Sequence, residues 1–258
     1  MLSLIEVSLF FLGAIVASFM GVVSARLYTG QSFIVGRSLC DACGTPLSVQ
    51  ALVPIFSYLL SGGRAGCCGA RLSLAAPLTE LLLGAFFVLA YWRVGLTLSL
   101  PVFLAALSVL LALVLYDLAH QILPTPLLVV FVAASAASGF LLAPTTREFL
   151  SVLGVAVLIG GSLALIHIFS RGKAMGFADA PLAFGLALLV GPSAFTGFVF
   201  SFWIGAIIGI VLLFLRPAGS RMRVEVPFAP FLASGFLLAY FTQWNIVDLF
   251  SAASLWWS

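Results

Sequence analysis

Charged residues are scarce in this sequence. Asp, Glu, Lys and Arg make up 7% of its 258 residues, whereas 63% are hydrophobic; an ordinary soluble domain carries about 25% charged residues. A water-soluble core of this length cannot hide so much apolar surface. The composition therefore excludes a soluble globular protein and predicts a polytopic integral membrane protein. The net charge of +3 is too small to indicate a nucleic-acid partner, so we expect none.

No Lys or Arg precedes the first apolar run. Glu6 lies near its start, and the first cation, Arg26, follows it. A secretory signal has the opposite polarity, with its cations before the apolar region. We therefore expect residues 4–25 to be retained as a first membrane span, with the N-terminus outside.

Long polar segments are also rare, and the only one is 27–75. The remainder divides into apolar runs near the roughly 20 residues that a helix needs to cross a bilayer core. The sequence predicts an all-α polytopic membrane protein with about eight transmembrane helices and one cytoplasmic, cysteine-containing loop between the first two. The sixth span ends at Gly191-Pro192, so its boundary with the seventh is weakly marked. The spans are expected at 4–25, 76–93, 97–116, 124–143, 149–169, 180–195, 196–215 and 229–248.

The eleven Lys and Arg residues are distributed unevenly about these spans. With the N-terminus outside, nine lie in inner loops and two, Arg93 and Arg147, lie in outer loops. Cytoplasmic loops of membrane proteins carry such an excess of cations, so the distribution favours this topology. The nine inner cations are Arg26, Arg37, Arg64, Arg71, Arg171, Lys173, Arg216, Arg221 and Arg223.

Only eight acids are present, and four of them are predicted at the inner ends of spans. Asp117 lies where the span at 97–116 leaves the membrane, and Asp179 lies where the span at 180–195 begins. The topology places both on the cytoplasmic side at similar depth, so they meet if these two spans are neighbours. The other acids at inner ends are Glu80 and Glu225, whereas Glu6, Asp41, Glu148 and Asp248 are expected to be solvated.

Two carboxylates that converge can share one proton. One then acts as a base on water while the other acts as an acid toward a carbonyl, as in aspartic proteases, without metal or cofactor. The residues alone also fit other interpretations. Asp179 followed by Pro181 fits a helix N-cap, and Asp117 fits a polar contact between helices. Paired acids also form proton or cation relays in transporters and channels.

All four cysteines lie in the 27–75 loop. SLCDACGTPLS carries Cys40 and Cys43, and GRAGCCGARLS carries Cys67 and Cys68. A cytoplasmic loop is in a reducing compartment, which disfavours structural disulfides, and two Cys-bearing halves with trailing Gly are typical of a zinc knuckle. Cys67 and Cys68 are adjacent, however, and neighbouring side chains do not readily reach one tetrahedral ion. The alternative is a compact loop with four reduced thiols.

Taken in order, these segments resemble the type IV prepilin peptidases, the bifunctional leader peptidases and N-methyltransferases of bacterial inner membranes. The similarity runs through nearly the whole chain. YDLAHQILP is similar to the family segment that holds the first catalytic Asp, and GFADAPLAFGLALLVG to its Gly-x-Gly-Asp segment. The other segments that carry the resemblance are FLGAIVASFMGVVSARL, RSLCDACGTPLS, VPIFSYLLSGGR, GRAGCCGARLS, APLTELLLGAFF and EVPFAPFLASG.

The resemblance implies an intramembrane aspartyl endopeptidase in which Asp117 and Asp179 activate the water. Such an enzyme cuts the basic leader of prepilins or pseudopilins on the cytoplasmic side, after a Gly. It then methylates the new N-terminal residue with S-adenosylmethionine. The expected partners are this substrate and membrane lipid, and the four cysteines are candidate zinc ligands. The other residues expected to line the site are Gly176, Ala178, His120 and Glu80.

The resemblance also implies how the chain is divided. Residues 1–27 are the first span, 28–75 the cytoplasmic Cys-containing loop associated with methyl transfer, and 76–258 the transmembrane peptidase domain. The protein is then a multi-pass protein of the bacterial inner membrane, with its active site facing the cytoplasm.

The chain departs from the family pattern near both acids. Ala178 stands where the family has Gly before the second Asp, and Pro181 stands where Lys is frequent. A methyl group at 178 reduces the space in which a substrate backbone approaches this position. Both acids remain, so we expect proteolysis to be kept. Two alternative interpretations remain. One is a peptidase whose methyl-transfer half is degenerate, and the other is a non-catalytic assembly factor with the family fold.

Overall fold

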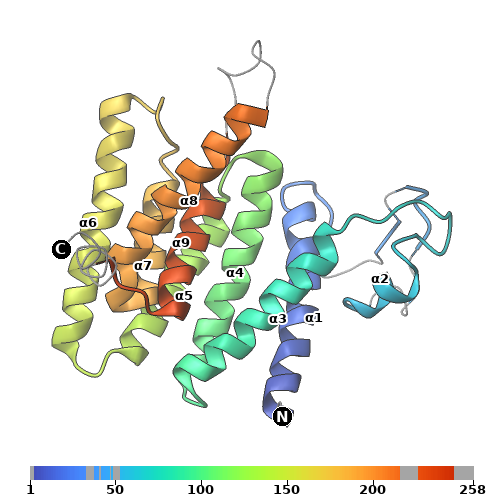
Figure 1. Cartoon of the computed structure of the whole chain (residues 1–258), viewed down its shortest axis with the longest axis horizontal. Coiled ribbons are helices and arrows are strands. Elements are labelled where there is room, and N and C mark those ends of the chain that lie inside the picture. The colour runs from blue at the N-terminus through green and yellow to red at the C-terminus, as the bar shows by residue number, and fades with distance from the viewer. Residues whose placement is uncertain are drawn as a thin grey trace, which may run out of the picture. The chain divides into compact units, whose positions relative to one another are not determined.

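The computed structural model describes residues 3–32, 38–40, 42–46, 48, 53–215 and 226–246. Within these residues all regular structure is helical, apart from two isolated bridges in the cysteine loop. Contacts divide the chain into two compact units, Met1–Gly95 and Leu96–Ser258, and each is described by itself (Figure 1). The helix at Ala75–Val94 therefore groups with the N-terminal span and the cysteine loop, whereas the predicted three-part functional division remains a prediction.

The first unit contains α1 (Leu4–Arg26), the short α2 (Phe56–Leu60) and α3 (Ala75–Val94). A capping box starts α1: the Ser3 N–H donates to Glu6 and the Glu6 N–H donates to the Ser3 hydroxyl. Helices α1 and α3 lie side by side and approach most closely at two glycines. A Cβ on Gly13 would lie 2.8 Å from the Cα of Gly84, so only glycine allows this approach.

The described residues of the second unit form seven helical elements. The helix α7 lies among the others, because ten of its twelve residues are buried and it packs against α5, α6, α8 and α9. Gly185 of α7 lies against the ring of Phe131, where a Cβ would be 2.8 Å from Cε1. The elements are α4 (Ser99–His120), α5 (Thr125–Leu142), α6 (Thr146–Ser170), α7 (Asp179–Val190), η2 (Gly191–Ser193), α8 (Ala194–Leu215) and α9 (Ala229–Thr242).

Each of the eight predicted spans contains a helix in its described residues, which confirms the all-α membrane fold. In the described part of the chain, six apolar helical segments are long enough to cross a membrane. The sixth of them combines α7, η2 and the first part of α8 as Asp179–Leu212. The chain is thus a multi-pass membrane protein.

Two predicted spans are too long. The span expected at 180–195 is a helix of 12 residues, about 18 Å at 1.5 Å per residue, and does not cross a bilayer core of about 30 Å alone. It ends where Gly191 has a φ of +60° and Pro192 opens the turn into α8. The span expected at 229–248 ends at Thr242, followed by Gln243 in the left-handed region.

Some predicted features lie outside the described residues. They include the end of the span at 229–248, four of the nine inner cations and three of the acids. The sidedness inferred from these residues therefore stays a prediction. The residues concerned are Arg37, Asp41, Arg216, Arg221, Arg223, Glu225 and Asp248.

Candidate active site and cysteine cluster

A cavity of about 820 Å³ opens in the second unit where α4 ends and α7 begins. Asp117 and Asp179 both line it, although they come from different helices. The helix α5 packs against both α4 and α7 and so links the two helices that carry the acids. The other lining residues are Gln121, Ile122, Leu123, Ile166, Gly172, Lys173, Ala174, Met175, Gly176, Phe177, Ala178, Phe202, Val226, Pro227 and Phe228.

Asp117 is held by the start of another helix. Its side chain is 5% exposed, in the last turn of α4, and its Oδ2 accepts the backbone N–H of Ala229 at 3.1 Å. Ala229 is the first residue of α9, whose N-cap residue, Phe228, offers no side-chain acceptor. The Asp117 carboxylate therefore takes the capping role from a different helix, where the helix dipole stabilises negative charge.

Asp179 is the first residue of α7 and is 8% exposed. The N-cap position is occupied by Ala178, which makes no side-chain capping bond, so the interpretation of Asp179 as the N-cap is wrong. The Asp179 carboxylate lies beside Gly176: a Cβ on Gly176 would be 3.5 Å from Oδ2. Glycine at 176 thus leaves the space next to one carboxylate oxygen open.

Two small residues that were expected near the acids do line the cavity. Gly176 is exposed, and Ala178 is half-buried between it and the helix start. Ala178 has φ −68° and ψ −17°, in the right-handed helical region that any L-residue adopts. The alanine that replaces the family's glycine therefore introduces no backbone strain.

The other two expected residues are not among those that line this cavity of the second unit. His120 is exposed and contacts Tyr116, with ring centroids 4.4 Å apart and planes tilted by 42°, and is not among the lining residues. Glu80 belongs to the first unit, where it is 6% exposed and its Oε2 accepts the N–H of Ile55 at 2.7 Å. Ile55 has a φ of +62°, which is rare for a β-branched residue. Glu80 thus holds a strained turn that leads into α2.

Sequence reasoning missed the aromatic wall of the cavity. Phe202 of α8 and Phe228 both line it, and their ring centroids are 5.6 Å apart. Phe228 precedes α9 within EVPFAPFLASG, one of the segments that carry the resemblance, so its position was a usable signal. Phe202 offered none, because a phenylalanine in an apolar helix looks the same whether it faces a cavity or lipid.

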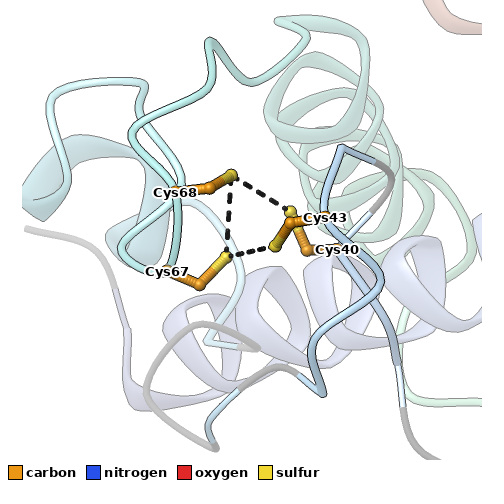
Figure 2. A group of neighbouring side chains, drawn as sticks. All are labelled: Cys40, Cys43, Cys67 and Cys68. Carbon is orange, nitrogen blue, oxygen red and sulfur yellow. Dashed lines mark hydrogen bonds between the residues drawn. The ribbon is translucent and has the colours of Figure 1, made fainter.

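The four cysteines of the first unit form a compact cluster. Figure 2 shows Cys40 and Cys43 on one segment and Cys67 and Cys68 on another, with the sulfur atoms pointing toward one another. All four Sγ atoms lie within 4.8 Å of each other. The Sγ distances are 3.8 Å for Cys40–Cys68, 3.3 Å for Cys43–Cys67 and 3.9 Å for Cys67–Cys68.

These distances fit a tetrahedral metal site. Zinc bound to four thiolates at about 2.3 Å sets neighbouring sulfurs about 3.8 Å apart. Adjacent Cys67 and Cys68 both reach the cluster, so their adjacency does not prevent four sulfurs from converging. The residues present therefore suit zinc by both number and spacing.

The two halves of the cluster repeat one turn. In the first half the Cys40 N–H donates to Thr45 at 2.9 Å and the Gly44 N–H donates to Cys40 at 2.8 Å. In the second half the Ala65 N–H donates to the Ala70 carbonyl at 2.8 Å, and the glycine at 69 donates to Ala65 at 2.7 Å. Both glycines have φ near +70° (69° and 70°), which such a turn requires.

This repeat explains the irregular spacing of the second pair. Ala65 stands at the turn position that Cys40 occupies in the first half, and Cys68 stands where the first half has Cys43. The side chain of Ala65 is 5% exposed and that of Cys40 is 6% exposed, so the positions also match in burial. Cys67 therefore supplies the sulfur that Ala65 lacks.

One thiol of the cluster is poised as a thiolate, the form that binds metal. The Thr45 hydroxyl lies 2.7 Å from the Cys43 sulfur. This hydrogen bond, with further ones from the Thr45 backbone and Cys67, lowers the pKa of Cys43 to about 6.

Comparisons with known proteins identify the family of this chain. Residues 11–94 match the model of the Bacterial Peptidase A24 N-terminal domain, which spans α1, the cysteine loop and α3. A protein of Legionella pneumophila described as prepilin leader peptidase/N-methyltransferase is 31% identical over 229 residues, covering 82% of this chain and 74% of the relative. The chain belongs to the prepilin leader peptidase/N-methyltransferase family.

Other members of this family are similar over comparable lengths. The prepilin leader peptidase/N-methyltransferase of Bacillus subtilis is 29% identical, with 96% of this chain and 98% of the relative covered. That of Myxococcus xanthus is 34% identical, with 81% of this chain and 64% of the relative covered. No solved structure matches the chain.

Proposed function

We propose that this protein cleaves the basic leader peptide of type IV prepilins or pseudopilins by a two-aspartate mechanism. The observation that carries the proposal is the cavity lined by both Asp117 and Asp179, which are 62 positions apart in the numbering and lie on different helices. Family membership supports the substrate class, because the relatives are prepilin leader peptidases. The acids lie at the ends of their helices, where a substrate segment just outside the membrane core reaches them.

The surroundings of the two acids suggest different roles. The hydrogen bond from the Ala229 N–H favours the ionised form of Asp117, so we assign Asp117 as the base and Asp179 as the holder of the shared proton. Asp117 takes a proton from water, the water oxygen attacks the scissile carbonyl carbon, and Asp179 gives its proton to the carbonyl oxygen. The C–N bond then breaks as the nitrogen takes the proton from Asp117, and the hydroxyl proton of the intermediate returns to Asp179.

The rest of the cavity suits a peptide at this position. Gly176 and Ala178 leave room for a substrate backbone beside Asp179, whereas Phe202 and Phe228 offer an apolar surface to a side chain next to the scissile bond. The proposed step gives no role to His120, which contacts Tyr116 and is not among the lining residues.

We also propose that the protein methylates the new N-terminus, with S-adenosylmethionine as the methyl donor that is consumed. The relatives support this, since those of Bacillus subtilis and Legionella pneumophila are both described as N-methyltransferases as well as leader peptidases. The four cysteines would hold a zinc ion in the first unit. A four-thiolate zinc site is closed, so its contribution is to stabilise the loop rather than to bind substrate.

The positive-inside distribution supports a location in the bacterial inner membrane with the cavity facing the cytoplasm. The substrate leader is basic and remains on that side until it is cut. Membrane lipid then surrounds both enzyme and substrate helix, because the substrate's apolar segment follows its leader.

The test is co-expression with a candidate prepilin in a host that lacks its own prepilin peptidase. The wild type should convert the prepilin to the shorter pilin, whereas Asp117→Asn and Asp179→Asn should each lower cleavage by about 100- to 10,000-fold. Glu148→Gln is the matched control, because Glu148 is an exposed acid in the first turn of α6. Undiminished cleavage by either Asp variant would eliminate the two-aspartate mechanism.

The same cells test methylation and the competing membrane functions. Mass spectrometry of the mature pilin should show a methylated N-terminal residue, and full cleavage without methylation would restrict the activity to proteolysis. A wild type that leaves every supplied prepilin and pseudopilin intact would favour a relay or an assembly role for the two acids.

A further inference from the structure

The cavity wall beside Asp179 is a loop, and one side chain of α6 holds it. The loop joins α6 to α7 and supplies Gly172 through Ala178 to the cavity lining. His167, in the last turn of α6, lies with its Nδ1 2.9 Å from the carbonyl oxygen of Met175. A carbonyl oxygen only accepts hydrogen bonds, so Nδ1 carries the proton and donates it. The contact therefore also defines which ring nitrogen is protonated.

The same imidazole contacts the loop at two further points. Its ring packs edge-on against Phe177, with centroids 5.5 Å apart and planes at 67°. Gly172, at the other end of the loop, lies beside the imidazole, because a Cβ on Gly172 would be 3.3 Å from Cε1 of His167. The Gly172 N–H also donates to the His167 carbonyl at 2.9 Å. Gly172 also has a φ of +76°. His167 thus contacts both the beginning and the end of the loop.

Two of these contacts lie on either side of Gly176, the residue beside the Asp179 carboxylate. Met175 and Phe177 flank Gly176, whose missing side chain would contact the Asp179 carboxylate. The Asp179 N–H in turn donates to the Gly176 carbonyl at 3.4 Å. A shift of the loop therefore shifts the backbone beside the reacting carboxylate.

We propose that His167 is a positioning residue for Asp179: it orients the loop 172–178 and so sets the geometry of the acid in the cavity. This inference rests on the proposed peptidase function. The imidazole acts both as a hydrogen-bond donor and as a flat ring, and substitutions can separate these two properties. Displacement of a catalytic group by about 1 Å can lower turnover about 100-fold, so modest loop movements are measurable.

Two substitutions separate the properties in the purified full-length enzyme acting on the prepilin that wild type cleaves. His167→Asn keeps an N–H near the position of Nδ1, and His167→Phe keeps the ring but not the donor. We expect His167→Phe to lower kcat about 10- to 100-fold with KM nearly unchanged, and His167→Asn to recover most of kcat. Ile168→Phe is the control, because it adds the same ring at the next, exposed position of α6.

A second pair of variants approaches the loop from its other end. Gly172→Ala introduces a methyl against the imidazole in a left-handed residue, whereas Gly30→Ala introduces the same methyl at the same φ of +76° with open space around it. Gly172→Ala should lower kcat well below that of Gly30→Ala. Equal kcat for this pair, or a wild-type kcat for His167→Phe, would overturn the proposal, as would a failure of His167→Asn to exceed His167→Phe.

Hydrogen exchange keeps this test independent of the peptidase proposal. Amides of residues 172–178 should exchange at least about tenfold faster in His167→Phe than in Ile168→Phe, while the rest of α6 and α7 is unchanged. Unchanged loop exchange would overturn the positioning role. If wild type, in the same preparation, fails to cleave prepilin while the loop responds as expected, the peptidase proposal fails and the role of His167 in ordering the loop stands.

Discussion

The carboxylate of Asp117 accepts the backbone N–H of Ala229 at 3.1 Å, across 112 positions of sequence. Ala229 begins α9, and Pro230 follows it with no N–H of its own, so this single bond satisfies an amide that the helix leaves unpaired. A candidate catalytic group is thus also the cap of a neighbouring helix. Its contributions to stability and to chemistry can be measured separately.

Asp117→Asn and Asp117→Ala should differ in stability but not in activity. Asn keeps a side-chain oxygen for the Ala229 N–H, whereas Ala leaves this amide without its partner, which costs about 0.5–2 kcal/mol. Both variants lack the carboxylate and should lose cleavage. Thermal unfolding of the detergent-solubilised protein, alongside the prepilin assay, measures both effects. Equal loss of stability in the two variants would show that the bond does not cap α9.

The cysteine cluster should bind one zinc per chain, and Cys67 should be needed for it. Cys67→Ser removes the sulfur that compensates for Ala65 and should lower the bound zinc, as Cys40→Ser and Cys43→Ser should. The double variant Ala65→Cys/Cys67→Ser should regain zinc, because Ala65 occupies the turn position equivalent to Cys40. Metal analysis of purified protein gives the result. Full zinc in Cys67→Ser alone would exclude Cys67 as a ligand.

Replacing Ala178 by Gly should change little. The residue has ordinary right-handed helical angles, so Gly removes only a methyl group and lowers stability by up to about 1 kcal/mol. We expect kcat/KM to change by less than about tenfold. Ala178→Leu is the contrasting variant, since its larger side chain enters the cavity and should reduce kcat/KM about 100-fold. A large gain in Ala178→Gly would instead show that the native methyl obstructs the substrate.

Glu80 should protect the amide of Ile55. An amide left without its hydrogen-bond partner loses about 1–3 kcal/mol, so Glu80→Ala should speed hydrogen exchange at Ile55 about 10- to 100-fold. Glu80→Gln retains an acceptor oxygen and should give an intermediate rate. The amide of Leu59 on α2 is an internal reference, because it donates to the Ile55 carbonyl and not to Glu80. Unchanged exchange at Ile55 in Glu80→Ala would contradict the assignment.

Much of the helical architecture could be predicted from composition alone. A span of apolar residues must form its own backbone hydrogen bonds in lipid, so each predicted span could only be a helix. The errors lie at α7 and α9. Hydrophobicity does not mark where a helix ends inside an apolar region, and the short α7 is apolar because other helices surround it.

The site was less predictable than the helices. Asp179 looked like an N-cap because Pro181 follows it, but helix capping depends on backbone angles that place Ala178 in that position. Phe202 gave no signal, His120 is not among the residues that line the cavity, and Glu80 belongs to the first unit. Local patterns pointed to the two acids and to Gly176 and Ala178, but not to the aromatic wall.

By itself, the sequence determined the membrane-embedded helices and the grouping of four cysteines, because both follow from residues close together in the chain. Three relationships were decided only by the tertiary structure: the shared cavity of Asp117 and Asp179, the Ala229 contact, and the place of Cys67 opposite Cys43. Each joins residues on separate segments, and their meeting depends on how those segments pack. Packing sums many weak contacts along whole helices, so no short stretch of sequence encodes it.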